Sequence, residues 1–436
     1  MKQLLGYLIF VNVLAGHVYA DGQVWSINYP KASDATGLQM PVLYRLWVPP
    51  DVKELRGVIV HQHGCGTGAS QNGLTAADDL HWQALARKWD CALLGPSYGQ
   101  EEDQKCHLWG DPRNGSAAAF LRCLDEFATI TNHPELRSVP WCLWGHSGGG
   151  AWVSIMHALY PQRVVAAWCR SGTAFVRWSQ GVLPPVDVSE EVYRVPLALN
   201  PGVRERGHQQ FDGIAWTGSL AMFNAYRKQN APVCFAPDPN TEHECGLSRL
   251  MAIPFLDECL RLRLPDRNGQ PLKPITDRDG PLLEAVIADF GPAFIEMDDQ
   301  LTAPNWFPSK AYKQLWREYL TTGIVLDQSP PPPPFNLTVE VEAGQVTLTW
   351  DAHADLQSGL RGFIIYRDGR EIARMPMKEV QGYQGYAFQG ISYGDTPHPQ
   401  LPPMSFCEQL PDGSTFSYSV VAVNGSGLLS LPVHAP

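Results

Sequence analysis

Hydrophobic residues follow two different patterns in the two parts of the chain. Up to about residue 328, uninterrupted apolar runs alternate with segments in which apolar residues recur every three or four positions. The runs are typical of buried strands and the spaced segments of amphipathic helices. The expected strands are 42–48, 57–61, 91–96, 140–144, 164–169, 195–199 and 232–236, and the expected helices are 82–89, 115–130, 151–160, 247–262, 282–290 and 310–319. This alternation predicts an α/β fold with a mostly parallel sheet and helices on both faces.

Beyond residue 334 the period of the pattern changes to two. Polar and apolar residues alternate in short segments, and the turn dipeptides Asp368-Gly369 and Asn424-Gly425 separate some of them. The expected strands here are 337–341, 345–350, 362–366, 371–374 and 416–423. Short alternating strands joined by tight turns predict an antiparallel β-sandwich of about 100 residues.

Five consecutive prolines, Pro330 to Pro334, stand between the two patterns. Such a run forms a stiff, extended spacer and offers no side chains to a core. We therefore expect an α/β domain at 21–328, a proline-rich linker at 329–334 and a β-sandwich at 335–436. The pattern of 265–327 is less regular, and its role is left open.

The first twenty residues have the features of a secretory signal. Lys2 supplies a positive charge, Leu4 to Ala15 is an apolar stretch too short to span a bilayer, and Val18-Tyr19-Ala20 fits a cleavage site. We expect residues 1–20 to be a signal peptide and the mature protein to be secreted or periplasmic. No later segment has the length of apolar sequence that a membrane span requires.

Composition excludes several classes of partner. The chain has 436 residues, 44% hydrophobic and 18% charged, which is typical of a globular protein. Its formal charge of −11 argues against nucleic acid and anionic membranes as partners.

All ten cysteines lie beyond the predicted signal, as suits an oxidising compartment. Cys234 with Cys245, and Cys106 with Cys123, are plausible disulfide pairs, whereas the apolar surroundings of Cys91, Cys142 and Cys169 predict buried free thiols. The chain has no Cys-x-x-Cys pair, and His61 with His63 provides only two ligands, so no metal site is expected.

The clearest chemical signal follows the apolar run 139–144. The chain continues Gly145-His146-Ser147-Gly148-Gly149, and a helical pattern begins at Ala151. A strand, a sharp turn and a helix with serine at the apex form a nucleophile elbow, which exposes the hydroxyl at the edge of the sheet. Glycine is needed two positions before and after the serine, because a Cβ there would clash between strand and helix.

A serine nucleophile needs a histidine base and an acid that orients the histidine. In this arrangement the chain order is serine, acid, histidine. Glu205 follows the expected strand 195–199 and is our candidate acid, with Asp212 and Asp238 as alternatives. His243 lies in the loop after the last expected strand of the first domain and is the candidate base.

The oxyanion of an acyl-transfer intermediate needs backbone N–H donors. Gly148 directly follows the serine and begins a helix, so its N–H is one candidate. The second is expected from the glycine-containing loop 61–66 after an early strand. We assign it to Cys65, with Gly64 as the alternative.

Residues 40–262 resemble the α/β-hydrolases, near the secreted esterases and the polyhydroxyalkanoate-depolymerase-like enzymes. His63-Gly64-Cys65 is similar to their oxyanion loop and Gly145 to Gly149 to their elbow, although their acid is more commonly aspartate. The resemblance implies hydrolysis of a small-molecule or polymeric carboxylic ester through an acyl-enzyme, with no cofactor. A peptidase of the prolyl-oligopeptidase type and a non-catalytic adhesion protein are the alternatives. The identity of the ester and the oligomeric state are left open.

The second domain carries its own resemblance. The strand ending at Trp350, the segment Ile364-Ile365-Tyr366-Arg367 and the segment Tyr418 to Asn424 resemble a fibronectin type III domain over 335–436. Tyr418 would then have the structural role of a tyrosine corner. The resemblance implies that this domain contacts a polymer or another protein.

Overall fold

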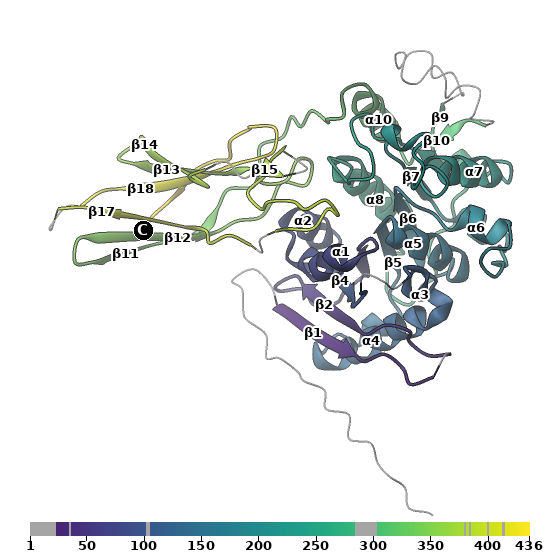
Figure 1. Cartoon of the computed structure of the whole chain (residues 1–436). Helices are drawn as coiled ribbons and strands as arrows, with labels where there is room; N and C mark the ends of the chain where they lie inside the picture. The colour runs from purple at the N-terminus through teal and green to yellow at the C-terminus, as the bar shows by residue number, and fades with distance from the viewer. Residues whose placement is uncertain are drawn as a thin grey trace, which may run out of the picture.

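The computed structural model describes residues 23–34, 36–101, 105–283, 303–378, 381–382, 385–398, 401–411 and 415–436. The predicted signal peptide lies outside these residues. Figure 1 shows an α/β body and a separate layer of β-strands packed beside it. Within the described ranges, no helix combines the length and the apolar character needed to cross a membrane.

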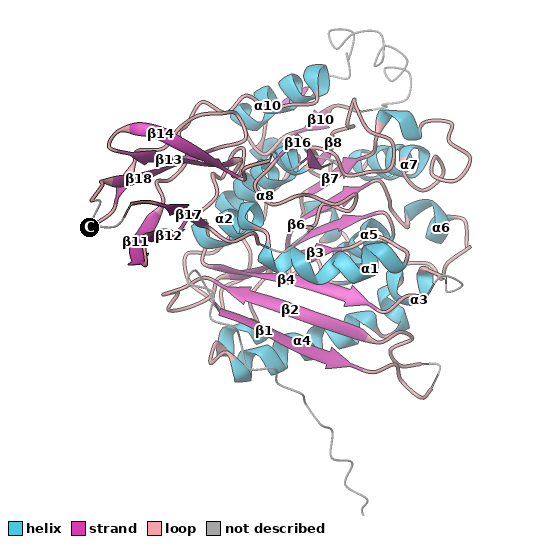
Figure 2. Ribbon diagram, turned by 60° about the vertical axis from the view of Figure 1, so that its left-hand side comes forward, coloured by secondary structure: helices cyan, strands magenta, loops and turns pink. Residues whose placement is uncertain are grey.

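The α/β body is built on one eight-stranded sheet (Figure 2). Its strands are β1 (Gln23–Tyr29), β2 (Val42–Val48), β3 (Gly57–Gln62), β4 (Cys91–Tyr98), β5 (Trp141–His146), β6 (Val164–Arg170), β7 (Leu197–Asn200) and β8 (Val233–Phe235). They lie in the order β1-β2-β4-β3-β5-β6-β7-β8. Only β1 with β2 and β2 with β4 pair antiparallel, so the remaining strands all end at the same edge of the sheet.

Helices cover both faces of this sheet (Figure 1). On one face lie α2 (Leu80–Lys88), α8 (Arg249–Arg263) and α10 (Lys310–Thr322). On the other lie α4 (Ser116–Ile130), α5 (Gly148–Leu159) and α7 (Trp216–Arg227). The short helices α1 (Thr67–Gly73), α3 (His107–Gly110) and α6 (Phe175–Ser179) lie in the segments that follow β3, β4 and β6.

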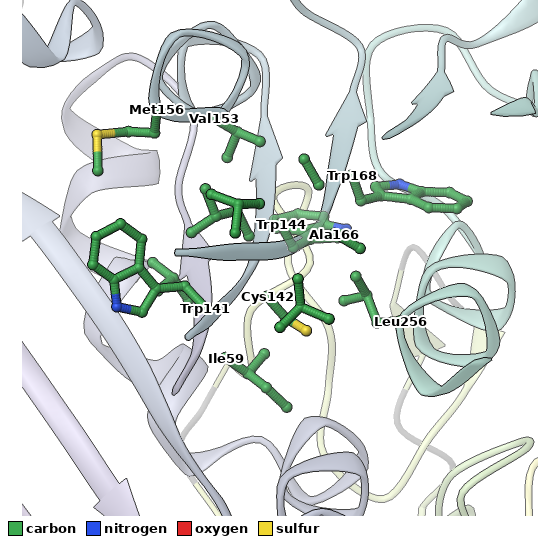
Figure 3. Packing of buried hydrophobic residues seen from close by; sticks show 14 of the residues in the cluster. Ile59, Trp141, Cys142, Trp144, Val153, Met156, Ala166, Trp168 and Leu256 are labelled. Atoms are coloured by element: carbon green, nitrogen blue, oxygen red, sulfur yellow. The ribbon is translucent and has the colours of Figure 1, made fainter. Parts of the chain in front are cut away.

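Alternation along the central strands decides which helix each side chain meets. Trp141 of β5 packs edge-on against Phe120 of α4, whereas Trp144 points to the opposite face and packs against Trp82 of α2. Trp168 lies beside Trp144 on the neighbouring strand and meets Phe255 of α8. Figure 3 shows Trp141, Trp144 and Trp168 around β5. A strand buried on both faces reads as the continuous apolar run seen in the sequence.

The second domain is a sandwich of two antiparallel sheets. One contains β11 (Phe335–Glu342), β12 (Gln345–Asp351) and β17 (Ser405–Gln409). The other contains β14 (Arg370–Met375), β13 (Gly362–Arg367), β18 (Tyr418–Val423) and β19 (Val433–His434). A separate pair is formed by β15 (Gln381–Gly382) and β16 (Gly385–Tyr386). Trp350, Phe363 and Val420 are buried between the sheets. The predicted fold class, an α/β sheet body followed by an antiparallel sandwich, is confirmed.

Some elements differ from the sequence-based expectation. The strands β1 and β17 and the helix α7 were not predicted. In the expected helix 282–290, Leu282 and Leu283 instead form a strand, β9 (Leu282–Leu283), that pairs with β10 (Asn305–Trp306), and the other residues lie outside the described ranges.

The predicted disulfide pairs are wrong. The structure contains a disulfide between Cys65 and Cys106, whereas Cys123, Cys234 and Cys245 are buried free thiols. Cys123 lies on the buried side of α4 and donates to the Phe120 carbonyl, while α3 brings Cys106 against the loop that carries Cys65. The expectation that Cys91, Cys142 and Cys169 are buried free thiols is confirmed.

Candidate active site

Ser147 stands at the apex of the turn between β5 and α5. Its backbone has φ 54° and ψ −115°, a left-handed conformation that a non-glycine residue seldom adopts. A Cβ on Gly145 would lie 2.3 Å from the Gly149 carbonyl oxygen, and one on Gly149 would lie 2.5 Å from the carbonyl oxygens of Gln62 and His63. The close approach of strand and helix therefore requires both glycines, and it aims Ser147 outward from the sheet edge.

The structure brings His243 and Glu205 to this serine. His243 Nε2 lies 2.8 Å from Ser147 Oγ, and His243 Nδ1 lies 2.5 Å from Glu205 Oε1. Glu205 sits in a single helical turn (Val203–Glu205) after β7, and His243 lies in the loop after β8. Because parallel strands end at one edge, residues from three strand ends converge there.

Glu205 is fully buried and its second carboxylate oxygen has partners of its own. Oε2 accepts hydrogen bonds from the Ser171 hydroxyl at 2.9 Å and from the Gly202 N–H at 2.7 Å. These two bonds fix the carboxylate while Oε1 faces the imidazole.

The two alternative acids are engaged elsewhere. Asp212 accepts from the Gly207 N–H at 2.8 Å and the Thr217 hydroxyl at 2.6 Å. Asp238 accepts from the Tyr319 hydroxyl and, at 2.9 Å, from the Asn240 N–H. Glu205 is thus the acid that the structure places against His243.

Burial opposes charge on both members of this pair. It raises the pKa of Glu205 and lowers the pKa of His243. The Arg170 guanidinium, the Gly202 N–H and the Ser171 hydroxyl act in the opposite sense on Glu205, since each stabilises the carboxylate. Arg170 also adds to the lowering of the His243 pKa. A neutral imidazole oriented by a carboxylate is the form that can accept a proton from serine.

Arg170 is a residue of this region that the sequence analysis did not single out. It ends β6 and is fully buried, donating at 2.9 Å to the Asn200 carbonyl and at 2.7 Å to the Thr241 hydroxyl. It also donates to the Glu244 carbonyl. One guanidinium therefore braces the loop on both sides of His243, and a charge at the end of an apolar strand was its only signal.

The loop that follows β3 passes directly beside Ser147. A Cβ on Gly64 would lie 3.3 Å from the Ser147 Cβ, and one on Gly148 would lie 2.1 Å from Cys65 Sγ and 2.2 Å from Cys106 Sγ. The disulfide thus lies against the first residue of α5. The structure brings Cys65, Gly64 and Gly148 together around the serine.

His63 fixes the shape of this loop. Its Nε2 accepts from the Tyr98 N–H at 3.0 Å, so its Nδ1 carries the proton and donates to the Gly64 carbonyl at 2.6 Å. Burial lowers the pKa of His63 to about 4, which keeps the ring neutral. Within the described ranges, no group of three or more His, Cys, Asp or Glu residues could hold a metal ion.

A cavity of about 130 Å³ opens beside Ser147. Its wall is mainly apolar and includes Cys65, Gly148, Ala174, Leu183 and Ile214.

Comparison with known proteins identifies no family. No protein-family model matches the chain, and no curated protein matches its sequence. A cold-adapted esterase from an Arctic intertidal metagenomic library is similar over 59% of this chain and 100% of its own, with 13% identity and a TM-score of 0.39.

An S-formylglutathione hydrolase from Agrobacterium tumefaciens is similar over 57% of this chain and 97% of its own, with 13% identity and a TM-score of 0.38. A ferulic acid esterase matches 51% of this chain and 92% of its own, with 13% identity and a TM-score of 0.35. Likenesses at this level do not bear on chemistry, which rests on the geometry of Ser147, His243 and Glu205.

Proposed function

We propose that the protein is a serine hydrolase that cleaves carboxylic esters through an acyl-enzyme. One observation carries the proposal: the continuous contact from Ser147 Oγ to His243 Nε2, and from His243 Nδ1 to Glu205, at the tip of a strained elbow. A secreted or periplasmic location belongs to the same proposal, and the Cys65–Cys106 disulfide supports it because such bonds persist in oxidising compartments.

In the proposed reaction His243 takes the proton of Ser147 as the serine oxygen attacks the ester carbonyl carbon. The N–H groups of Gly148 and Cys65 stabilise the negative oxygen that forms. The C–O bond to the alcohol then breaks, and His243 gives its proton to the departing alcohol. A water molecule, deprotonated by His243, attacks the acyl-enzyme and releases the acid with Ser147 restored.

The small cavity beside Ser147 supports an ester with a short acyl group. The direct test is to treat the protein with a fluorophosphonate probe and map the modified residue. We expect the label on Ser147. Turnover of short p-nitrophenyl esters, compared with peptidyl anilides, then separates an esterase from a peptidase. Absence of both label and turnover would favour the non-catalytic alternative.

Loss of the disulfide is expected to weaken the reaction without weakening substrate binding. Cys106→Ser frees the loop that carries the Cys65 N–H, so we expect kcat to fall about tenfold at an unchanged KM. Complete loss of one oxyanion donor costs about 10²–10³ in kcat. Steady-state kinetics of the variant, with Cys407→Ser at an exposed free thiol as control, measures the effect. Equal kcat values for the two variants would contradict this role.

The pH dependence should reflect the buried imidazole. Burial and the Arg170 charge lower the pKa of His243, so the ring stays neutral at a lower pH than an ordinary histidine, whose pKa is about 6.5. The neutral ring is the base and the ionised Glu205 orients it, and burial raises the pKa of Glu205 to about 7, so we expect kcat/KM to lose half its value only below about pH 7. A half-maximal point above that pH, in buffers where the fold is intact, would contradict the expectation.

A further inference from the structure

We propose that the β-sandwich helps to position the active site. Its segment 389–397, here called the docking loop, holds two parts of the α/β body in place: the loop that carries His243, and the strand β3 that leads into the oxyanion loop. Asp395 is the positioning residue. This inference rests on the proposed ester hydrolysis. It gives the second domain a structural role in the site, beside the expected contact with a polymer or another protein.

Asp395 lies inside the α/β body although it belongs to the second domain. Its side chain is fully buried, and Oδ1 accepts from Arg249 Nε at 2.8 Å. Its Oδ2 accepts from Trp82 Nε1 at 3.0 Å and contacts His61 Nε2 at 3.1 Å. A buried carboxylate requires such partners, because an unpaired charge away from water is costly.

Two of these partners belong to segments that adjoin the proposed catalytic groups. Arg249 begins α8, directly after the loop that holds His243, and it also binds Asp79 at 2.7 Å. His61 lies on β3, the strand that leads into His63, Gly64 and Cys65. One carboxylate therefore ties the helix after the base to the strand before the oxyanion loop.

One aromatic contact links this point to the elbow. The His61 ring stacks on Trp144 with ring centres 3.9 Å apart, and Trp144 lies on β5 just before Ser147. A change in the His61 position is thus transmitted to both strands that frame the site.

A second contact from the docking loop reaches the His243 loop itself. The Tyr393 carbonyl accepts from the Cys245 N–H at 2.9 Å. The Tyr393 ring lies with its centre 5.7 Å from that of His146 and 6.4 Å from that of His243. His146 in turn hydrogen-bonds the His243 carbonyl at 2.7 Å. Tyr393 is 39% exposed, and its ring is the part of the docking loop beside the base.

Hydrogen bonds and shared hydrophobic burial also join the two domains elsewhere in the interface. The Gln389 side chain accepts from the Leu80 N–H at 2.9 Å and donates to the Asp78 carbonyl at 2.8 Å. Leu80 of α2 is buried within the hydrophobic core of the sandwich. Such shared burial fixes the position of one domain relative to the other. Domains joined only by a linker lack this constraint.

Asp395→Asn tests the role with little change in volume. The carboxylate accepts on both oxygens, whereas an amide has one oxygen and an NH₂ group that must face either Arg249 or the Trp82 N–H. One N–H donor would therefore always face the NH₂ group instead of an oxygen, so the docking loop should shift. Misplacement of catalytic groups by about 1 Å can cost about 10²-fold in rate. We expect kcat to fall about 10- to 100-fold with KM little changed.

The matched control is Glu408→Gln. Glu408 accepts from Arg367 at 2.6 Å and from the Tyr418 hydroxyl at 2.7 Å, so it is also a paired carboxylate, but both of its partners lie within the sandwich. We expect this variant to lose thermal stability while keeping the kcat of the wild type.

Three measurements on the full chain separate positioning from stability: kcat and KM on a p-nitrophenyl ester, the rate of fluorophosphonate labelling, and the low-field proton resonance of the His243 Nδ1–H. The inference predicts that Asp395→Asn slows labelling and shifts or broadens the resonance below its melting temperature, and that Glu408→Gln does neither. Wild-type kcat and an unchanged resonance in Asp395→Asn would overturn it.

If Asp395→Asn does not fold, Tyr393→Ala decides. It removes a partly exposed ring beside His243 and keeps the backbone carbonyl, and a fall in kcat of about fivefold or more is expected. An unchanged kcat and resonance in this variant would overturn the inference. Failure of the wild type to label at Ser147 would instead overturn the proposed function, and the inference with it.

Discussion

Replacing Ser147 by alanine is expected to lower kcat by about five to six orders of magnitude, with little change in KM. The hydroxyl is the proposed nucleophile, and no acyl-enzyme can form without it. What remains is the catalysis that the oxyanion donors and substrate binding supply. Burst and steady-state kinetics on a p-nitrophenyl ester, together with fluorophosphonate labelling, measure the loss.

Ser154→Ala is the matched control for this experiment. Ser154 lies on the same helix as the elbow glycines, and its hydroxyl donates to the Ala151 carbonyl at 2.8 Å and accepts from the Ala174 N–H at 3.0 Å. We expect it to affect stability and not turnover. Retention of more than about 1% of wild-type kcat in Ser147→Ala, or a label on another serine, would be incompatible with the mechanism.

The second large effect is expected for Glu205→Gln, which should lower kcat by about 10⁴. Oε2 of Glu205 already accepts from Ser171 and Gly202, so the glutamine oxygen would take that side and its NH₂ would face His243 Nδ1. The imidazole would then carry its proton on Nε2, where it can no longer accept the proton of Ser147.

Asp212→Asn and Asp238→Asn are the controls, because both positions were alternatives for the acid. Each carboxylate is bonded to groups other than His243. We expect both variants to keep most of the wild-type kcat, because neither carboxylate contacts His243. A loss of about 10⁴ in either, with activity retained in Glu205→Gln, would reassign the acid.

The sequence pattern predicted that Ser147, Glu205 and His243 lie close together, and the structure brings their side chains into contact. Ser147 is specified by glycines within two positions of it, and these glycines answer a steric demand that the structure displays. Glu205 and His243 were found because strand ends in a parallel sheet meet at one edge. The central strands were predictable because burial on both faces leaves a continuous apolar run in the sequence.

Other features depend on contacts that leave no local signal. Cys65 and Cys106 are 41 positions apart, and their pairing depends on how α3 packs on the elbow helix. Arg170 acts through backbone carbonyls, which every residue has. By contrast, the helix Trp216–Arg227 has a local signal that was not used: Trp216, Leu220, Phe223 and Tyr226 recur every three or four positions.

The bond between His61 and Asp395 joins residues 334 positions apart in the chain. Synthesis proceeds from the N-terminus, so Ser147, Glu205 and His243 all leave the ribosome well before Asp395 does. A polypeptide that ends before Asp395 would therefore contain every reacting group and still lack this bond. We expect a chain that terminates before the docking loop to have impaired activity, although it contains Ser147, Glu205 and His243.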